Sequence, residues 1–470
     1  MEAQPLHLKR ELGLGSGITM IIGTMIGSGI FVSPGGVLQR SGSVGASLVV
    51  WLVCGVCATL GAMSYIELGT MFPASGADYI YLMQGLGPFV GYLYAWMNTF
   101  VLRPVAGAVI CQVFALYLLQ PFYNHFGSHT FTEDLKWNLE KGVTILALSM
   151  MILFSLLVDP VKMASWLQNV LTVAKLIAIA LIVAGGTYHI AMGEFEYLEQ
   201  GFDQVPNTTD SKTQIGPFLA QMLTINPIFR NLNLSILIGI PLVTVIYVLV
   251  NIAYLTVLSP SQVLRSDAVV VTWGRLFFKD TSYEFLGEYV PWVASGFVAL
   301  STFGAANGTL FGSSRVSFAA AREGHLPEIL SYIHSKQRTP IPSLILFTIM
   351  AIGLVLTSDT YTMIDFFSFV AWMFYGGSFL SVITLRFTGA KLERPFRIWI
   401  VIPILLTFIS VFLVLAPIIS DPQKEYLYVL AFMASGVLFY VPFVLKKWRI
   451  PGMNSFNRKI CAVCSLSPGE

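Results

Sequence analysis

Residues 24–31 read Thr-Met-Ile-Gly-Ser-Gly-Ile-Phe and interrupt an otherwise apolar segment. Gly27 and Gly29 flank Ser28, and glycine weakens a helix where no water can hydrogen-bond the exposed backbone. A helix broken here would present the free N–H groups and the positive dipole end of its second half. These groups suit a carboxylate such as that of an amino acid, with the Ser28 hydroxyl as a further donor. The alternative is close helix packing, because Gly23 and Gly27 have Gly-x-x-x-Gly spacing.

Lys175 lies within the apolar sequence LTVAKLIAIALI. A lysine at mid-depth in a membrane is costly and commonly functional, and it needs carbonyl or hydroxyl acceptors from a broken helix. A fixed ammonium group there can hold two helices together, as a bound sodium ion does in other proteins. No coupling ion would then be needed. A purely structural charge at a helix junction is the alternative interpretation.

Three further apolar segments carry polar or aromatic residues of interest. Arg103-Pro104 either lines a pathway or marks a kink with a buried partner. Trp372 and Tyr375 lie in FSFVAWMFYGG, where packing is the simplest interpretation and gating the alternative. Glu67 lies near the end of an apolar segment, and we expect it to reach the membrane interface.

The sequence motifs of common enzymes and pumps are absent. The chain contains no His-Glu-x-x-His, Gly-x-Ser-x-Gly or Walker motif, so we expect neither an enzyme nor an ATP-driven pump. Cys54 and Cys57 have the spacing of a redox or zinc pair, but they lie in an apolar run with no nearby His. We therefore expect no catalytic residue, no metal ion and no cofactor.

The composition indicates the elements that must position these residues. Of 470 residues, 55% are hydrophobic and 11% are charged, whereas a typical soluble protein has about 25% charged residues. This excludes an ordinary soluble enzyme, a nucleic-acid binder and a disordered scaffold. Long uncharged runs such as 236–258 are typical of transmembrane helices. We expect an all-α polytopic protein in the lipid bilayer, with no cleavable signal peptide in the polar residues 1–16.

Eleven segments have the length and hydropathy of spans, and a twelfth, 213–229, is doubtful. It would form only ~25 Å of helix and contains Pro217 and Pro227. If segment 213–229 crosses the membrane and the N-terminus is cytoplasmic, most lysines and arginines of the later loops also lie in the cytoplasm. This is the distribution that the positive-inside rule requires. We therefore predict twelve crossings with both termini in the cytoplasm. The clear segments are 17–35, 44–66, 87–119, 142–158, 163–188, 235–258, 290–314, 341–357, 361–385, 398–419 and 425–444.

Several stretches closely resemble one family along nearly the whole chain. These stretches resemble light chains of the heteromeric amino-acid transporters, of the L-type and the b-zero-plus type. These transporters belong to the amino acid–polyamine–organocation superfamily. The cystine and dibasic amino-acid type is the most similar subtype. The stretches are KRELGLGSGITMIIGTMIGSGIFVSPGGVL (9–38), LTVAKLIAIALI, IGIPLVTVIYVLVNIAYLTVL, STFGAANGT (301–309) with AAAREGHLP (319–327), FSFVAWMFYG, and ERPFRIWIVIPILLTFISVFLVLAPIIS (393–420).

This resemblance implies a leucine-transporter-type inverted-repeat fold on a twelve-helix plan, here with a shortened sixth helix. The chain would be a single transporter domain. Its parts would be a cytoplasmic N-terminus (1–16), a first five-helix repeat (17–188), a second repeat with the truncated sixth helix (213–385), two extra helices (398–444) and a cytoplasmic tail (445–470).

The resemblance also implies a function and a set of site residues. It implies sodium-independent antiport of amino acids by alternating access across the plasma membrane. The substrates would be neutral amino acids, with dibasic amino acids or cystine as further candidates. The substrate's α-carboxylate would bind at Ile26, Gly27, Ser28, Gly29 and Ile30, Lys175 would replace a sodium site, and Trp372 and Tyr375 would serve as gating or pocket residues.

One departure from the family concerns the sixth helix. The family has an aromatic-rich motif of the kind Gly-Leu-Trp-Ala-Tyr-Asp-Gly-Trp-Asn there, but this chain has no Trp between Trp166 and Trp273 and no acidic residue between Asp210 and Asp267. A stretch about one span long, ~20 residues, is missing. It would supply carbonyl acceptors for the amino group, a gating tryptophan and an acid for cationic side chains. The alternative function is therefore a transport-dead or regulatory isoform of the same fold.

A second departure lies in PFYNHFGSHTF, after the third span. Members that couple to a heavy-chain glycoprotein usually have a Cys where this chain has Phe126. We expect no disulfide to a heavy chain, while non-covalent association remains an option. The expected partners are thus the amino-acid substrate, the bilayer and such a heavy chain, with no nucleic acid.

Overall fold

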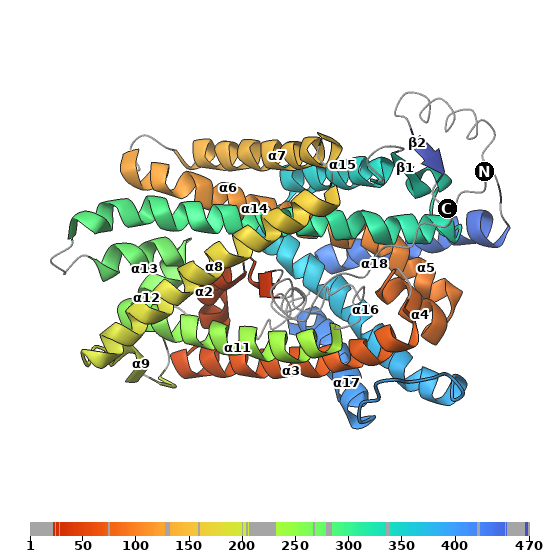
Figure 1. Cartoon of the computed structure of the whole chain (residues 1–470), viewed down its shortest axis with the longest axis horizontal. Helices are drawn as coiled ribbons and strands as arrows, with labels where there is room; N and C mark the ends of the chain where they lie inside the picture. Colours follow the sequence, from red (N-terminus) through yellow and green to blue (C-terminus); the bar gives the residue numbers. More distant parts are fainter. Residues whose placement is uncertain are drawn as a thin grey trace.

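The computed structural model shows a bundle of long helices (Figure 1). The doubtful segment 213–229 lies outside the residues that it describes, as do Thr24 and Ser28. The described residues are 22–23, 25–27, 29–73, 76–126, 132–157, 160–199, 201–203, 205, 232–266, 268–278, 284–334, 339–420, 424–446, 448 and 466–468.

Within these residues, eight helices are long and apolar enough to cross a membrane. Each coincides with a segment expected from the sequence, which confirms an all-α polytopic membrane protein. They are α3 (Val44–Met71), the continuous run of α5 (Pro88–Met97), η1 (Asn98–Leu102) and α6 (Arg103–Phe126), α8 (Pro160–Ala191), α11 (Leu232–Val257), α14 (Glu284–Arg322), α16 (Thr360–Thr388), α17 (Val401–Ser420), and α18 (Lys424–Phe439) continuing into η3 (Tyr440–Leu445).

Three more helices correspond to the other expected segments. α15 (Ile341–Thr357) matches its predicted bounds, α7 (Glu133–Leu157) begins earlier than 142, and α2 (Gly29–Ser41) forms the second half of the first segment. β1 pairs antiparallel with β2 and thereby joins the chain after α14 to residues near the C-terminus. The short elements are α4 (Asp78–Leu86), α9 (Glu196–Glu199), α12 (Pro260–Arg265), α13 (Val269–Phe277), η2 (Glu328–Ser331), β1 (Tyr332–His334) and β2 (Leu466–Pro468).

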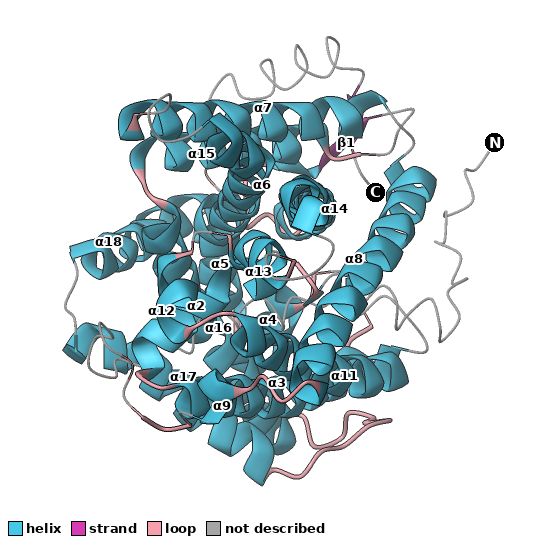
Figure 2. Ribbon diagram, turned by 90° about the vertical axis from the view of Figure 1, so that its left-hand side faces the viewer, coloured by secondary structure: helices cyan, strands magenta, loops and turns pink. Residues whose placement is uncertain are grey.

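Two groups of helices lie on either side of α16. α3 and α11 run together along the lower edge of Figure 1, while α6, α7 and α14 run along its upper edge and α16 crosses obliquely between them. The view turned by 90° also shows α3 beside α11 and α6 beside α14 (Figure 2). α2 and α16 therefore lie between the two groups in this view.

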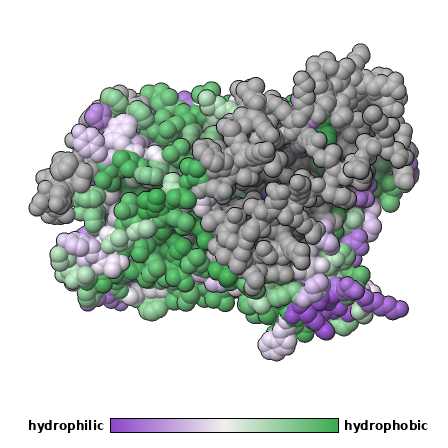
Figure 3. Space-filling view, in the orientation of Figure 1, coloured by the Kyte–Doolittle hydropathy of each residue, from purple (hydrophilic) through white to green (hydrophobic). Residues whose placement is uncertain are grey.

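The surface is apolar over much of its area. Leu52 on α3, Leu146 on α7 and Phe408 on α17 are each more than half exposed. Hydrophobic residues dominate the middle of the described part of the face shown in Figure 3, while hydrophilic residues lie at its left-hand end and gather at its lower right. A contiguous apolar surface of this kind would be a liability in water, but it suits the hydrocarbon core of a bilayer.

Glu67 is completely buried, which corrects the expectation that it reaches the membrane interface. Arg386 on α16 donates to its carboxylate through both Nε, at 3.2 Å, and a terminal guanidinium nitrogen, at 2.6 Å. The backbone N–H of Ile398 donates to it at 2.9 Å, and Arg394 Nε lies 3.8 Å away. Because these groups balance its charge, the carboxylate is buried and ties the end of α3 to the α16–α17 connection.

We predict that Glu67→Gln lowers the thermal midpoint of the detergent-purified protein. The change leaves the buried guanidinium of Arg386 without its counter-charge, and breaking a buried pair in this way costs about 3–5 kcal/mol. Glu393→Gln, at an exposed position beyond α16, is the control and should leave the midpoint unchanged. Equal midpoints for Glu67→Gln and the unmodified chain would show that this ion pair contributes nothing.

Candidate functional site

The first apolar segment breaks where the sequence predicts. Residues 22, 23 and 25 are helical, the chain bends at 26 and 27, and α2 begins at Gly29. In a regular helix the N–H of Gly27 would donate to the carbonyl of Gly23, four residues earlier. Here it donates instead to the carbonyl of Met25 at 2.8 Å. The break therefore leaves helical carbonyls without their usual partners.

Side chains from two other helices supply those partners. Lys175 on α8 is buried, and its ammonium donates to the Gly23 carbonyl at 2.9 Å. Tyr247 on α11 donates through its hydroxyl to the Met25 carbonyl at 2.7 Å. The ring of Trp51 packs edge-on against Tyr247, with 5.6 Å between the ring centroids. The backbone at the break is thus hydrogen-bonded to α8 and α11, as burial in an apolar medium requires.

A second irregularity lies in the long helix formed by α5, η1 and α6. Pro104 has no N–H, so the regular hydrogen bond to the carbonyl of Phe100 is lost. The N–H of Arg103 donates to the carbonyl of Asn98, and η1 is a π-helical turn. Such widened turns occur frequently at functional sites. This one carries Asn98, Leu102 and, directly after it, Arg103 to the wall of a cavity.

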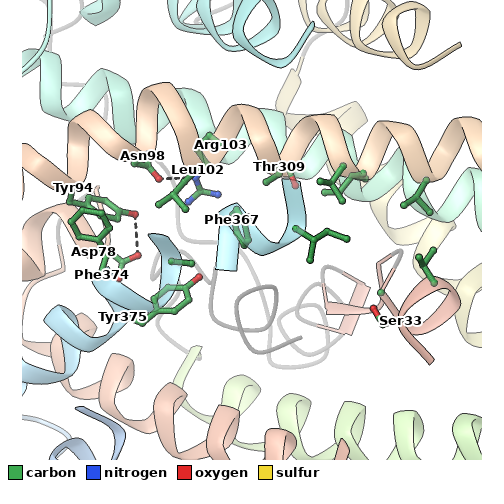
Figure 4. Close-up of a pocket in the computed structure, with 18 residues that line it drawn as sticks. Ser33, Asp78, Tyr94, Asn98, Leu102, Arg103, Thr309, Phe367, Phe374 and Tyr375 are labelled. Carbon is green, nitrogen blue, oxygen red and sulfur yellow. Dashed lines mark hydrogen bonds between the residues drawn. The ribbon is translucent and has the colours of Figure 1, made fainter. Parts of the chain in front are cut away.

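The cavity lies between the broken helix, this π turn, α14 and α16 (Figure 4). Its volume is about 110 Å³, whereas one water molecule needs only ~10–15 Å³ on this measure. The space is therefore of a size for a small molecule. The lining residues include Gly29, Val32 and Ser33 of α2, Asp78 of α4, Tyr94 of α5, Asn98 and Leu102 of η1, Arg103 of α6, Thr309 of α14, and Phe367, Phe374 and Tyr375 of α16.

Asp78 and Arg103 supply opposite charges to this cavity. Asp78 is buried, accepting hydrogen bonds from the Tyr94 hydroxyl at 3.2 Å and the Ser378 hydroxyl at 3.1 Å. It lies outside the apolar spans, and burial raises the pKa of its carboxyl, while the hydroxyls of Tyr65 and Ser378 and the charge of Arg103 oppose the rise. Arg103 donates through Nε to Asn98 Oδ1 at 3.1 Å and forms no ion pair within the described ranges. Arg103 thus has a buried partner and also lines the cavity.

The residues singled out in the sequence divide between the cavity and its supports. Gly29 and Tyr375 line it. Trp372 is buried and packs edge-on against Tyr375, with ring centroids 6.0 Å apart. Lys175 supports the break instead of lining the cavity. Ile26, Gly27 and Ile30 are buried around the break, and Ser28 lies outside the described residues.

Three site residues were missed by the sequence analysis. Asp78 and Asn98 carry no recognisable motif, and Tyr247 is one aromatic residue in a long apolar run. The nearest available signal was Pro104, because a proline inside a span disturbs the turn before it. Phe126, where a heavy-chain Cys was considered, is the exposed last residue of α6. The part of the chain that the structure describes contains no cluster of metal-ligating side chains.

The fold and the cavity define a polytopic membrane protein with a cavity beside a broken helix. The chain belongs to the amino acid permease family, whose model matches residues 12–441. It is 41% identical to the b(0,+)-type amino acid transporter 1 of Rattus norvegicus over 469 aligned positions, covering 95% of this chain and 91% of the rat protein. The Homo sapiens protein of that name is 41% identical, covering 95% and 90%. The large neutral amino acids transporter small subunit 2 of Rattus norvegicus is 37% identical, covering 98% and 87%. The resemblance to light chains of heteromeric amino-acid transporters is thereby confirmed.

We predict that Gly23→Ala destabilises the junction between the first segment and α8. A Cβ at Gly23 would overlap the Thr172 side chain, its hydroxyl oxygen first, so the first segment or α8 must shift, and we expect the Lys175 hydrogen bond to the Gly23 carbonyl to weaken. Overpacking of this kind costs about 1–3 kcal/mol, measurable as a lower thermal midpoint.

The matched control is Gly36→Ala on α2. A Cβ there meets nothing within 4 Å, and replacing a helical glycine stabilises by about 0.5–1 kcal/mol. The prediction is wrong if Gly23→Ala and Gly36→Ala have the same thermal midpoint.

Proposed function

We propose that this chain is a membrane transporter that binds amino acids in the cavity between α2, η1, α14 and α16. The observation that carries the proposal is that Gly29, the first residue of α2 after the break, lines the cavity. Membership of the amino acid permease family supports it, as do relatives whose names describe amino acid transporters. A transporter of this kind is not an enzyme.

The α-carboxylate of the substrate would bind at the start of α2. The first N–H groups of a helix have no partner within the helix, and they favour an anion together with the helix dipole. Gly27 and Gly29 let the carboxylate approach the backbone, and Ser28 adds a hydroxyl donor. Ile26 and Ile30, on either side, are completely buried and anchor the binding stretch in the core.

Lys175 would take the place of a coupling sodium ion. Its ammonium joins α8 to the carbonyl side of the break, which is where a cation is needed to hold an unwound segment. Transport would then be sodium-independent. Tyr375 would contact the substrate from α16, and Trp372, packed edge-on against it, would set the position of its ring during gating.

The full activity would be antiport by alternating access in the plasma membrane, with both termini in the cytoplasm. Neutral amino acids are the proposed substrates, with dibasic amino acids and cystine as further candidates from the resemblance. A heavy-chain glycoprotein would associate without a disulfide. Phe126 lies exposed at the end of α6, where a covalently coupled relative would have its Cys.

A second candidate is a form of the same fold that binds amino acids but does not exchange them. It is favoured by the missing sixth-helix motif, which would contribute the amino-group acceptors and the gating tryptophan. The alignment with the rat relative is 469 positions long but holds only 95% of this 470-residue chain, so this chain has gaps within it. Binding and exchange must therefore be measured separately.

We predict that Gly29→Val weakens amino-acid binding by about tenfold or more, because a β-branched side chain blocks the carboxylate from the backbone. Binding of labelled leucine to the purified protein is the measurement. Gly36→Val is the matched control on the same helix, where a Cβ would meet no neighbouring atom within 4 Å. If the Gly29→Val protein bound leucine with unchanged affinity, the proposal that the α-carboxylate binds at Gly29 would be wrong.

For the second candidate, we predict that exchange by this chain in proteoliposomes is weak or absent, since the sequence lacks the sixth-helix motif. Inserting the missing stretch from a b-zero-plus relative should restore exchange of labelled amino acid. Robust exchange by the unmodified 470-residue chain would rule out the non-exchanging candidate. Failure of the insertion to restore exchange, in a protein that still binds, would show that the lost motif is not the cause.

A further inference from the structure

The orientation of the Asn98 amide is determined by its neighbour. Arg103 Nε can only donate, and it lies 3.1 Å from the Asn98 side chain. The atom that faces it must therefore be the carbonyl oxygen Oδ1. The amide nitrogen Nδ2 consequently points elsewhere. It is buried and has no hydrogen-bond acceptor among the described residues.

Most buried polar groups in folded proteins have a partner. Nine buried side-chain N or O atoms of the described residues have none, and Asn98 Nδ2 is the one among them that belongs to a residue of the cavity wall. Asn98 is 1% exposed, so a molecule in that cavity is placed to supply the acceptor that the described residues do not. The Arg103 guanidinium also has donors that lack an acceptor among the described residues. Its guanidinium carries five N–H donors, of which one bonds Asn98 Oδ1, and no carboxylate of the described chain pairs with it.

No hydrogen bond or ion pair between described residues joins these donors to Asp78, the acidic group of the cavity. Both oxygens of Asp78 already accept hydroxyl hydrogen bonds, from Tyr94 and Ser378. Figure 4 shows Asp78 beside Tyr94, with the Asn98–Arg103 pair farther along the cavity toward Thr309. The remaining donors of Asn98 and Arg103 in the cavity wall therefore lack hydrogen-bond acceptors within the part of the chain that the structure describes, and the rest of the lining is largely apolar.

We propose that Asn98 and Arg103 form a side-chain subsite that selects amino acids whose side chains carry an acceptor, either a carboxamide or a carboxylate. This inference rests on the proposed function. With the α-carboxylate at the start of α2, near Ser33 in Figure 4, the substrate's side chain runs along the cavity toward Arg103. An acceptor there pairs with Asn98 Nδ2 and the guanidinium. A lysine or arginine side chain would bring more donors and a like charge, which the site disfavours.

The first test measures binding to the full chain in lipid nanodiscs, by displacement of labelled glutamine and by ligand-induced thermal stabilisation. Neither readout requires transport. Glutamine and glutamate should bind roughly threefold to tenfold more tightly than leucine, which has no acceptor, and lysine should bind more weakly than leucine. If leucine binds as tightly as glutamine, or if lysine binds best, the proposed side-chain subsite is wrong, but the proposed function of amino-acid binding is still supported. If no amino acid binds, the proposed function fails, and this inference fails with it.

The second test uses variants at Asn98. Asn98→Leu removes the amide at similar volume and should abolish the preference for glutamine over leucine, leaving leucine binding within about twofold. Asn98→Asp places a carboxylate against Arg103 and should reverse the order of glutamate and lysine. A uniform loss for all amino acids in a folded Asn98→Leu protein would mean that Asn98 contacts the common backbone atoms, which overturns the subsite.

The matched control is Asn251→Leu on α11. Asn251 is also buried, but its Nδ2 is satisfied by the Tyr247 carbonyl at 2.8 Å and it does not line the cavity. The same chemical change there should leave the order of ligands as in the unmodified chain. If Asn251→Leu also abolished the glutamine preference, the effect would not belong to the cavity wall.

Discussion

A helix that unwinds inside an apolar medium must find hydrogen-bond partners for the backbone groups it exposes, and the site of this protein is organised around that requirement. The break before Gly29 exposes the carbonyls of Gly23 and Met25. Lys175 and Tyr247 satisfy them from α8 and α11. Because each partner comes from a different helix, the break also determines how these helices meet. We propose that the N–H groups on the other side of the break bind the ligand.

The π turn complements the break from the opposite wall of the cavity. Both irregularities arise where the regular helical hydrogen bonds are weakened or lost, through glycine flexibility in one case and the missing N–H of Pro104 in the other. The first supplies backbone donors near Gly29, and the second turns Asn98 and Arg103 toward the same space. A cavity with donors on two walls suits a molecule rich in acceptors. Asp78, already bonded to hydroxyls, moderates the positive charge.

Away from the cavity, rigidity comes from charges that are fully paired. Glu67 receives donors from Arg386 and from the Ile398 backbone, so α3, α16 and the connection to α17 meet at one buried point. The contrast with Asn98 is informative. Both oxygens of the Glu67 carboxylate accept from Arg386, and the buried cluster holds helices together. Asn98 Nδ2, in the cavity wall, has no acceptor among the described residues.

The sequence by itself determined the helical membrane architecture, because an uncharged run long enough to span the bilayer has little alternative to a helix. It also located the break at Gly27–Gly29 and singled out Lys175, since both violate the apolar pattern. What it could not determine were partners distant along the chain. Glu67 was expected at the interface because its pairing with Arg386 spans 319 residues, and burial of a charge depends on that partner. The orientation of Asn98, and with it the donor left free in the cavity, likewise depends on a π turn that only the folded helix displays.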